Sequence, residues 1–398
     1  MSVAGIICEY DPLHTGHAYL MEQARRAGAE AVVCALSGNF TQRGGFAVTD
    51  KLSRAEMAVL CGADLVLEAP TVWAMSTAER FAQGGVDILT RTGVVTELVF
   101  GSECGDIAAL RRAADALESP EFAAALAALP EDGRTFAARR QAAVATLLGT
   151  EGAAVLERPN NTLAVEYLRA IRRLGSPLEA RTVRRAGAQH GQEAFGGFAS
   201  ASYLRRLLAA GEIEGAAAYM PPAAAEILRR EQAAGRVTDP ALCERAILSR
   251  LRTMTADDWQ RYDGGGEGLG NRLYQASRTG GTLEEVLAAA KTKRYPAGTA
   301  AADGAGGVAG AAGAAGMRAL SAGAGRQRYG AAFAAADAGR RRAGADEAGG
   351  CVPAGDGSGN ALCRGEPVYR SLCAGPARSG ADGTGAGAAD DTGDAVDG

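Results

Sequence analysis

The sequence has few histidines, a small net charge and no long apolar run, which argues against several classes of protein. Its 398 residues include only three histidines and two tryptophans, which leaves few imidazoles for a metal centre. The formal net charge is -4, so a nucleic acid would have to be held by a local basic patch. No apolar run approaches the roughly 18 uncharged residues of a membrane span, and no basic leader opens the chain. We therefore expect a cytoplasmic protein with neither a membrane nor DNA as partner.

Eight cysteines are present, but they lack the spacing of a disulfide framework or a zinc site. Five of them occur singly within apolar segments, without CxxC or Cys/His spacing: Cys8, Cys34, Cys61, Cys104 and Cys243. The pattern predicts reduced cysteines in the core.

Short apolar runs alternate with helical periodicity along the N-terminal part of the chain. Runs at residues 3–10, 30–37, 63–70 and 96–103 predict strands, and the segments between them have helical spacing. This alternation is typical of an α/β fold in which helices cover both faces of a parallel sheet. Ligands of such sheets bind beyond the carboxyl ends of the strands, where "EYDPLHTGH", "SGNFTQRGG", "EAPTVWA" and "FGSE" lie.

Beyond residue 105 the pattern is mainly helical. Asn160 or Asn161 is expected to cap a helix that runs to about residue 174, and residues 178–185 predict a further strand. We expect a first domain over residues 1–210 with a helical insertion at about 106–156, a helical domain over 211–296, and a tail over 297–398. The tail is dominated by Ala and Gly and has no isoleucine or lysine, so it buries too little apolar surface to offset its ordering entropy.

Two of the three histidines lie three residues apart in "EYDPLHTGH", at the junction of a predicted strand and helix. A turn with Pro12 and then Gly16 at a helix start gathers free N–H groups and the positive end of a helix dipole. His14 and His17 can both face a phosphate there and stabilise the charge that grows on it during displacement. We interpret this loop as a nucleotide site, with both histidines catalytic.

Two other interpretations of the loop stay open. The histidines can simply satisfy backbone carbonyls in a turn. A zinc site would need further ligands at useful spacing, and the only other histidine is His190.

The loop resembles the HxGH signature of the nucleotidyltransferase and class I aminoacyl-tRNA synthetase superfamily. "GIICEYDPLHTGHAYL" resembles the pattern EYNPFHNGH of one family, and "SGNFTQRGGFAVTDKLSRAEMAVLCGADLVLEAP" resembles its next block. "FGSE", "RPNNTLAVEYLRAI", "SASYLRRLL" and "KTKRY" follow in family order. Over about residues 1–295 the chain is thus similar to the tRNA(Met) cytidine acetate ligase family. The resemblance implies a Rossmann-like nucleotidyltransferase domain of the HUP type.

The first motif departs from the family pattern at Asp11, Leu13 and Thr15, where Asn, Phe and Asn are usual. Both histidines and Gly16 remain. The charge of Asp11 lies near an expected triphosphate, so it should weaken ATP binding unless Arg43 or a metal ion offsets it.

The resemblance implies an enzyme that uses ATP, with Mg²⁺, to convert acetate to acetyl-adenylate. It would then acetylate the exocyclic amine of the wobble cytidine in elongator tRNA(Met). Acetate is a poor acylating agent, so its carboxylate must first displace pyrophosphate at the α-phosphate, where His14 and His17 would stabilise the charge.

The ATP contacts that the resemblance implies come from four motifs and a helix start. They are Ile7, Cys8, Glu9, Tyr10, Asp11, Pro12, Leu13, His14, Thr15, Gly16, His17, Ala18, Tyr19, Leu20, Gly101, Asn160, Asn161, Arg185, Ser202 and Arg205. Structural roles compete for several of these residues. Gly101 fits a strand-end turn, the two asparagines and Ser202 fit helix caps, and Arg185 fits a solvated basic stretch.

The polar loop "SGNFTQRGG" and two basic clusters are candidates for substrate contacts. Ser37, Asn39, Gln42 and Arg43 are too polar for a packing turn, so we expect a lid or an acceptor contact. Local positive charge for tRNA is supplied by Arg169, Arg172, Arg173, Arg181, Arg184 and Arg185, and by Lys291, Lys293 and Arg294. Each cluster alone is also typical of a solvated helix face.

In the family, "KTKRY" is followed by a basic amphipathic helix, whereas here an Ala/Gly-rich segment follows. Degenerate codons for residues 297–304, read one nucleotide forward, permit "RARLRRMV", which restores such a helix. The tail is therefore either the product of a frameshift, and without function, or a disordered extension.

Two other functions stay open on the sequence alone. Another HxGH adenylyltransferase, acting on a small molecule, would share the first motif and turn over without RNA. A non-catalytic nucleotide- or RNA-binding protein would bind ATP without releasing pyrophosphate.

Overall fold

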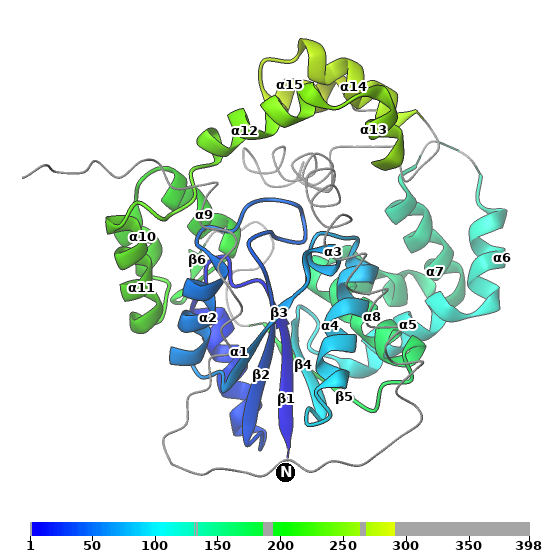
Figure 1. Ribbon diagram of the computed structural model, residues 1–398. Coiled ribbons are helices and arrows are strands. Elements are labelled where there is room, and N and C mark those ends of the chain that lie inside the picture. The colour runs from blue at the N-terminus through cyan, green and yellow to red at the C-terminus, as the bar shows by residue number, and fades with distance from the viewer. Residues whose placement is uncertain (1, 131, 133, 186–193, 263–267, 291–398) are drawn as a thin grey trace, which may run out of the picture. The chain divides into compact units, whose positions relative to one another are not determined.

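A parallel sheet of five strands forms the centre of the protein, which is described by a computed structural model over residues 2–130, 132, 134–185, 194–262 and 268–290. The strands are β1 (Val3–Cys8), β2 (Ala31–Ser37), β3 (Leu65–Ala69), β4 (Glu97–Ser102) and β5 (Glu179–Arg184). Their order is β3-β2-β1-β4-β5, with every neighbouring pair parallel (Figure 1). The predicted Rossmann-like α/β fold is confirmed, and all five strands lie within the segments that the sequence predicted as strands.

The sheet changes winding direction between β1 and β4, because the chain adds β2 and β3 on one side of β1 and then β4 and β5 on the other. Diverging connections leave a crevice at the carboxyl ends of such a strand pair, where α/β proteins bind ligands. The two-histidine loop follows β1 and "FGSE" ends β4, so both motifs lie at this crevice.

Helices cover both faces of the sheet (Figure 1). One core joins it to α1 (Thr15–Arg26), α2 (Lys51–Leu60), α9 (Ala201–Ala209), α10 (Ile213–Ala217) and α11 (Pro222–Ala233). The other core involves α4 (Ala78–Arg91), α5 (Ile107–Glu118), α6 (Pro120–Ala128), α7 (Phe136–Ala154), the 3₁₀ turn η1 (Val155–Glu157) and α8 (Pro159–Arg173). The helices of the first core, called the first layer from here on, lie on both sides of residue 210. The domain boundary expected at that residue stays a prediction.

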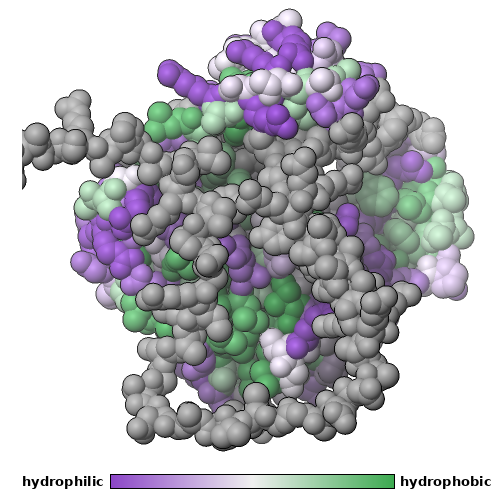
Figure 2. Space-filling view, viewed as in Figure 1, coloured by the Kyte–Doolittle hydropathy of each residue, from purple (hydrophilic) through white to green (hydrophobic). Residues whose placement is uncertain are grey.

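The outer face of the first layer is charged. Hydrophilic side chains gather over α10 and α11 (Figure 2), where Arg229 pairs with Glu214 and Arg230 pairs with Glu56 of α2. This division, apolar inward and charged outward, is the amphipathic pattern of a surface helix.

A third core lies in the C-terminal helices α12 (Pro240–Thr253), α13 (Ala256–Tyr262), α14 (Leu269–Thr279) and α15 (Leu283–Ala290). Trp259 is buried in it, and Phe40 and Phe46 of the "SGNFTQRGG" region pack against it. The short elements α3 (Thr71–Ala74), β6 (Ala194–Phe195) and β7 (Phe198–Ala199) complete the described structure. The sequence pattern did not predict the β6–β7 hairpin.

The cysteines are only partly as expected. All five described cysteines are free, but only Cys8 and Cys34 are buried, and the other three are partly exposed. In the described part of the chain, no helix is long and apolar enough to cross a membrane. The tail and its reading-frame hypothesis lie outside the described residues.

Candidate active site

The two histidines of the first motif form the N-terminal cap of α1. Nδ1 of His14 accepts the N–H of Gly16 at 3.1 Å, and Nδ1 of His17 accepts the N–H of His14 at 3.3 Å. The imidazole rings stack, with centroids 3.7 Å apart and planes inclined by 22°. Because each Nδ1 accepts a hydrogen bond, a neutral ring carries its proton on Nε2. Each histidine thus keeps one N–H donor for a ligand.

Both imidazoles are held neutral by their surroundings. Burial, together with the nearby Arg185 and Arg205 guanidiniums, lowers the pKa of His14 to about 3. Burial also lowers the pKa of His17 well below its usual value, with His14 and Arg185 contributing. The pair therefore donates hydrogen bonds at neutral pH without carrying charge.

The backbone around the pair is tightly constrained. A Cβ at residue 16 would lie 3.0 Å from Cε1 and 3.1 Å from Nδ1 of His14, so only glycine leaves that ring in place. Tyr10 is buried and has a φ of 47°, a left-handed conformation that costs energy for an aromatic residue. Its ring centroid lies 5.0 Å from that of His17, so this constrained residue supports the histidine pair directly.

The charge of Asp11 is offset by Arg205 and not by Arg43, the residue expected from the sequence. Asp11 is buried, and its carboxylate accepts the N–H of Val48 at 2.6 Å. Arg205 donates to the backbone oxygen of Asp11 at 2.7 Å and lies 3.5 Å from its carboxylate. Arg43 is exposed and makes no described contact with Asp11. The substitution of Asp for the usual Asn is therefore accommodated by Arg205.

Arg205 and Ser202 stand at the start of α9, as predicted, but Ser202 is not the cap. Ser200 is the N-cap residue, and its hydroxyl accepts the N–H of Tyr203 at 3.1 Å. Ser202 accepts a hydrogen bond from Arg205 at 3.1 Å instead. The pair thus links α9 to the first motif.

The loop "SGNFTQRGG" is tied down by its own polar side chains. Asn39 accepts the N–H of Lys51 at 2.8 Å, and Gln42 donates from Nε2 to the carbonyl of Ser76 at 2.7 Å. The Gln42 N–H also donates to the carboxylate of Glu9, whose pKa is raised by burial. The Ser37 hydroxyl is buried, which leaves Arg43 as the exposed side chain among the four candidates.

Arg54 is a site residue that the sequence pattern did not identify. It lies on α2 with no exposed area, and its guanidinium donates to the carbonyls of Thr49, Ser37, Glu9 and Gly38. The distances to the first three are 3.1, 3.1 and 2.6 Å. Arg54 therefore joins the loop after β1 to the loop after β2. Its only sequence signal was a charged residue on the buried side of an amphipathic helix.

The motifs "FGSE", "RPNN" and "TVRR" meet at one point beside the histidines. Arg185 donates from a terminal nitrogen to Oδ1 of Asn160 at 3.3 Å. A Cβ on Gly101 would lie 3.2 Å from Cγ of Arg185, so the glycine makes room for the arginine stem. Asn160 and Asn161 do not cap α8 as predicted, because the N-cap residue is Arg158. They bond to Glu103, which sequence reasoning had not assigned to the site.

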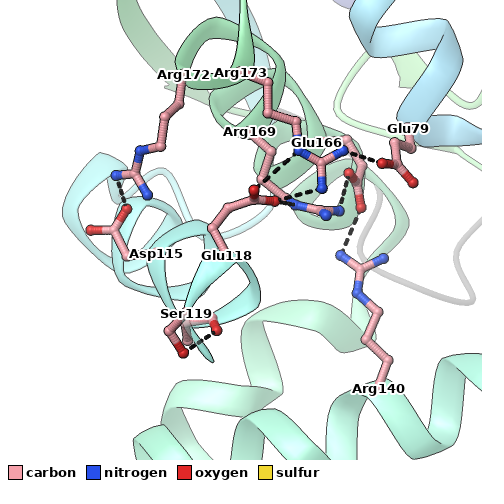
Figure 3. A network of polar contacts seen from close by, with 10 residues as sticks. Glu79, Asp115, Glu118, Ser119, Arg140, Glu166, Arg169, Arg172 and Arg173 are labelled. Atoms are coloured by element: carbon pink, nitrogen blue, oxygen red, sulfur yellow. Dashed lines mark hydrogen bonds and ion pairs between the residues drawn. The ribbon is translucent and has the colours of Figure 1, made fainter. Parts of the chain in front are cut away.

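The arginines of the first basic cluster are mostly paired with carboxylates (Figure 3). Arg169 bonds Glu118 and Glu166, Arg172 bonds Asp115, and Arg173 bonds Glu79 and Glu118. Arg181 likewise pairs with Glu97 at 2.7 Å. These contacts join α8 to α4 and α5 and β5 to β4, so they stabilise the layers around the sheet. Lys291, Lys293 and Arg294 lie outside the described residues.

The remaining first-motif candidates differ in burial, and their contact with ATP stays a prediction. Pro12 and Leu13 are buried, whereas Ile7, Ala18, Tyr19 and Leu20 are partly exposed. Thr15 donates to the carbonyl of Gly197 at 3.0 Å, which fixes the loop against the β6–β7 hairpin.

Known proteins similar to this chain share both its sequence and its fold. The family described as HIGH Nucleotidyl Transferase matches residues 1–299. The tRNA(Met) cytidine acetate ligase of Fervidobacterium nodosum is 35% identical over 301 residues, 74% of this chain and 70% of that protein. The enzyme of the same name from Syntrophomonas wolfei is 39% identical, with 74% and 73% covered.

Solved structures give the same relationship. Thermotoga maritima TmcAL bound with alpha-thio ATP aligns with a TM-score of 0.71 at 32% identity, covering 80% of this chain and 75% of that one. Its apo form aligns with a TM-score of 0.72 at 33% identity. The chain belongs to the HIGH nucleotidyltransferase family and, within it, to the tRNA(Met) cytidine acetate ligases.

Proposed function

We propose that this protein uses ATP to activate acetate and then acetylates the exocyclic amine of the wobble cytidine in elongator tRNA(Met). The observation that carries the proposal is the neutral, stacked His14–His17 pair at the N-terminus of α1, beside Arg185 at the crevice between β1 and β4. The family relationship supports it, since the relatives bear this activity in their names and one solved relative is bound with an ATP analogue.

The first half-reaction asks the site to stabilise charge on the α-phosphate. A carboxylate oxygen of acetate forms a bond to phosphorus as the bond to the pyrophosphate oxygen breaks. The Nε2–H groups of the two histidines and the free N–H groups of α1 donate to the phosphate oxygens as their charge grows. Donors already fixed in place need no reorganisation during the step. Arg185 adds positive charge without transferring a proton.

The second half-reaction needs the cytidine amine close to the acyl carbon. The amine nitrogen bonds to that carbon, the bond to the adenylate oxygen breaks, AMP leaves, and the amine loses a proton. We assign the acceptor side of the crevice to "SGNFTQRGG", whose Arg43 is exposed beyond the anchored Asn39 and Gln42.

Magnesium would accompany ATP. Among the described residues no group of three or more His, Cys, Asp or Glu side chains is placed to hold a metal ion. Mg²⁺ bound largely by phosphate oxygens and water would neutralise part of the triphosphate charge.

The test is transfer of labelled acetate to an elongator tRNA(Met) transcript in the presence of ATP. Label should enter that transcript and be absent from a matched transcript with uridine at the wobble position. Equal labelling of both transcripts would refute the proposed acceptor. Turnover of ATP and acetate that ignores tRNA would favour a small-molecule adenylyltransferase.

A further inference from the structure

Glu103 lies at the carboxyl end of β4, and its carboxylate closes the N-terminus of α8. One carboxylate oxygen accepts the N–H of Asn160 at 3.1 Å and its Nδ2 at 2.7 Å. The other accepts the N–H of Asn161 at 2.7 Å. The N-cap residue Arg158 provides no side-chain hydrogen bond, so Glu103 satisfies donors that α8 itself leaves open.

The start of α8 in turn accepts hydrogen bonds from the backbone at the end of β4. Oδ1 of Asn161 accepts the backbone N–H of Glu103 at 2.9 Å and that of Cys104 at 3.1 Å. Asn161 is buried, and these two bonds fix the backbone that follows β4. Glu103 and Asn161 thus lock the end of β4 and the start of α8 to each other, although 57 residues separate these segments in the sequence.

This lock fixes the orientation of Asn160. The Nδ2 donor of its amide is held by Glu103, so Oδ1 faces Arg185, which donates to it at 3.3 Å. Arg185 passes over Gly101 and lies close enough to lower the pKa of both histidines. A chain of contacts therefore runs from Glu103 through Asn160 and Arg185 towards the histidine pair.

We infer that Glu103 is a positioning residue for ATP, acting through the orientation of Asn160 and Arg185. The inference rests on the proposed ATP site. A carboxylate suits this task because it accepts all three N–H groups, whereas an amide of the same shape would turn an NH₂ towards one of them. Glu103→Gln keeps the side-chain volume and removes this match.

The experiment measures the Kd of ATP by titration, without acetate or tRNA, for wild type, Glu103→Gln and Glu118→Gln. Glu118 is the matched control, because it also holds α8 through ion pairs but does so at Arg169 and Arg173, near the other end of that helix. We expect the Kd of Glu103→Gln to rise roughly tenfold, the loss of one charge-assisted hydrogen bond, and that of Glu118→Gln to stay unchanged.

A second arm separates positioning from a loss of folded protein. In Asn160→Ala, adding Glu103→Gln should change the Kd of ATP little, because the two residues act through one contact. In acetate-dependent pyrophosphate exchange, Glu103→Gln should raise KM for ATP and leave KM for acetate unchanged, whereas partial unfolding would lower kcat alone.

An unchanged Kd in folded Glu103→Gln would overturn the inference. Loss of the fold in both Glu103→Gln and Glu103→Asp, with Glu118→Gln folded, would also overturn it by making Glu103 a folding element. Wild type that binds ATP without acetate-dependent exchange would instead count against the proposed function, and the variants would still decide the role of Glu103.

Discussion

The surroundings of His14 and His17 keep both imidazoles in the neutral state. The rings of His14 and His17 stack at 3.7 Å, a separation at which two imidazolium charges would repel strongly. Burial and the nearby arginines remove that conflict by lowering both pKa values. In the proposed first half-reaction the histidines therefore serve as fixed hydrogen-bond donors and transfer no proton.

Neutral histidines make the protein sensitive to acid. The folded protein leaves His14 unprotonated down to a pKa of about 3, whereas in the unfolded chain it gains a proton near pH 6.5. The unfolded state therefore binds more protons in this window, and the free energy of unfolding falls as pH drops below about 6.5. The slope approaches about 1.4 kcal/mol per pH unit for each such histidine.

His14→Asn tests this linkage, because asparagine also caps a helix and does not titrate. Urea unfolding of wild type and variant between pH 7 and pH 5 should show a smaller loss of stability in the variant, by up to that slope. Parallel pH profiles would contradict the neutral assignment of His14.

At the scale of elements, α2 holds the loops after β1 and β2 together through one buried side chain. Arg54 donates to carbonyls in the loops after β1 and β2, so the first motif and "SGNFTQRGG" keep a fixed relation. Buried carbonyls left without donors cost more than the net gain of the bonds themselves.

Arg54→Met removes all of these donors while keeping a long apolar stem. We expect it to lower the free energy of unfolding by about 3 kcal/mol, measured in urea, and to weaken ATP binding in the protein that remains folded. Arg91→Met is the control, because that arginine is exposed on α4 and, among the described residues, bonds Asp87 of its own helix alone. Equal unfolding midpoints for the two variants would contradict the role given to Arg54.

At the scale of the whole molecule, the distribution of paired and unpaired arginines bears on tRNA binding. Much of the first basic cluster neutralises carboxylates between helices, as Figure 3 shows for Arg169, Arg172 and Arg173. Arg43, in contrast, is exposed in the loop after β2 and takes part in none of the described ion pairs. Positive charge available to phosphates is therefore expected at the crevice more than along α8.

Arg43→Ala and Arg172→Ala provide a matched comparison. The slope of log affinity for tRNA against log salt concentration should become shallower by about 0.8 for Arg43→Ala, the loss of one phosphate contact. Arg172 pairs with Asp115, so its removal should leave the slope unchanged. A larger change of this slope for Arg172→Ala than for Arg43→Ala would contradict the expectation and would place the tRNA-binding surface along α8.

Sequence patterns predicted the five strands and the two-histidine site, because alternating periodicity and a strand–turn–helix motif are local signals. Sequence patterns failed where a residue's hydrogen-bond or ion-pair partner is distant in the chain. Asn160 and Asn161 look like local caps, yet Glu103 provides the cap from 57 residues away. Arg54 and the Asp11–Arg205 pair were missed for the same reason, since burial and pairing arise only when the layers pack.

Acetate-dependent exchange of labelled pyrophosphate into ATP, measured on wild type and His17→Ala, decides whether this site forms an acyl-adenylate. We expect exchange in wild type that requires acetate and does not require tRNA, and its loss in His17→Ala while the variant stays folded. Exchange retained in His17→Ala, or ATP binding in wild type without any exchange, would contradict adenylate formation at the histidine pair.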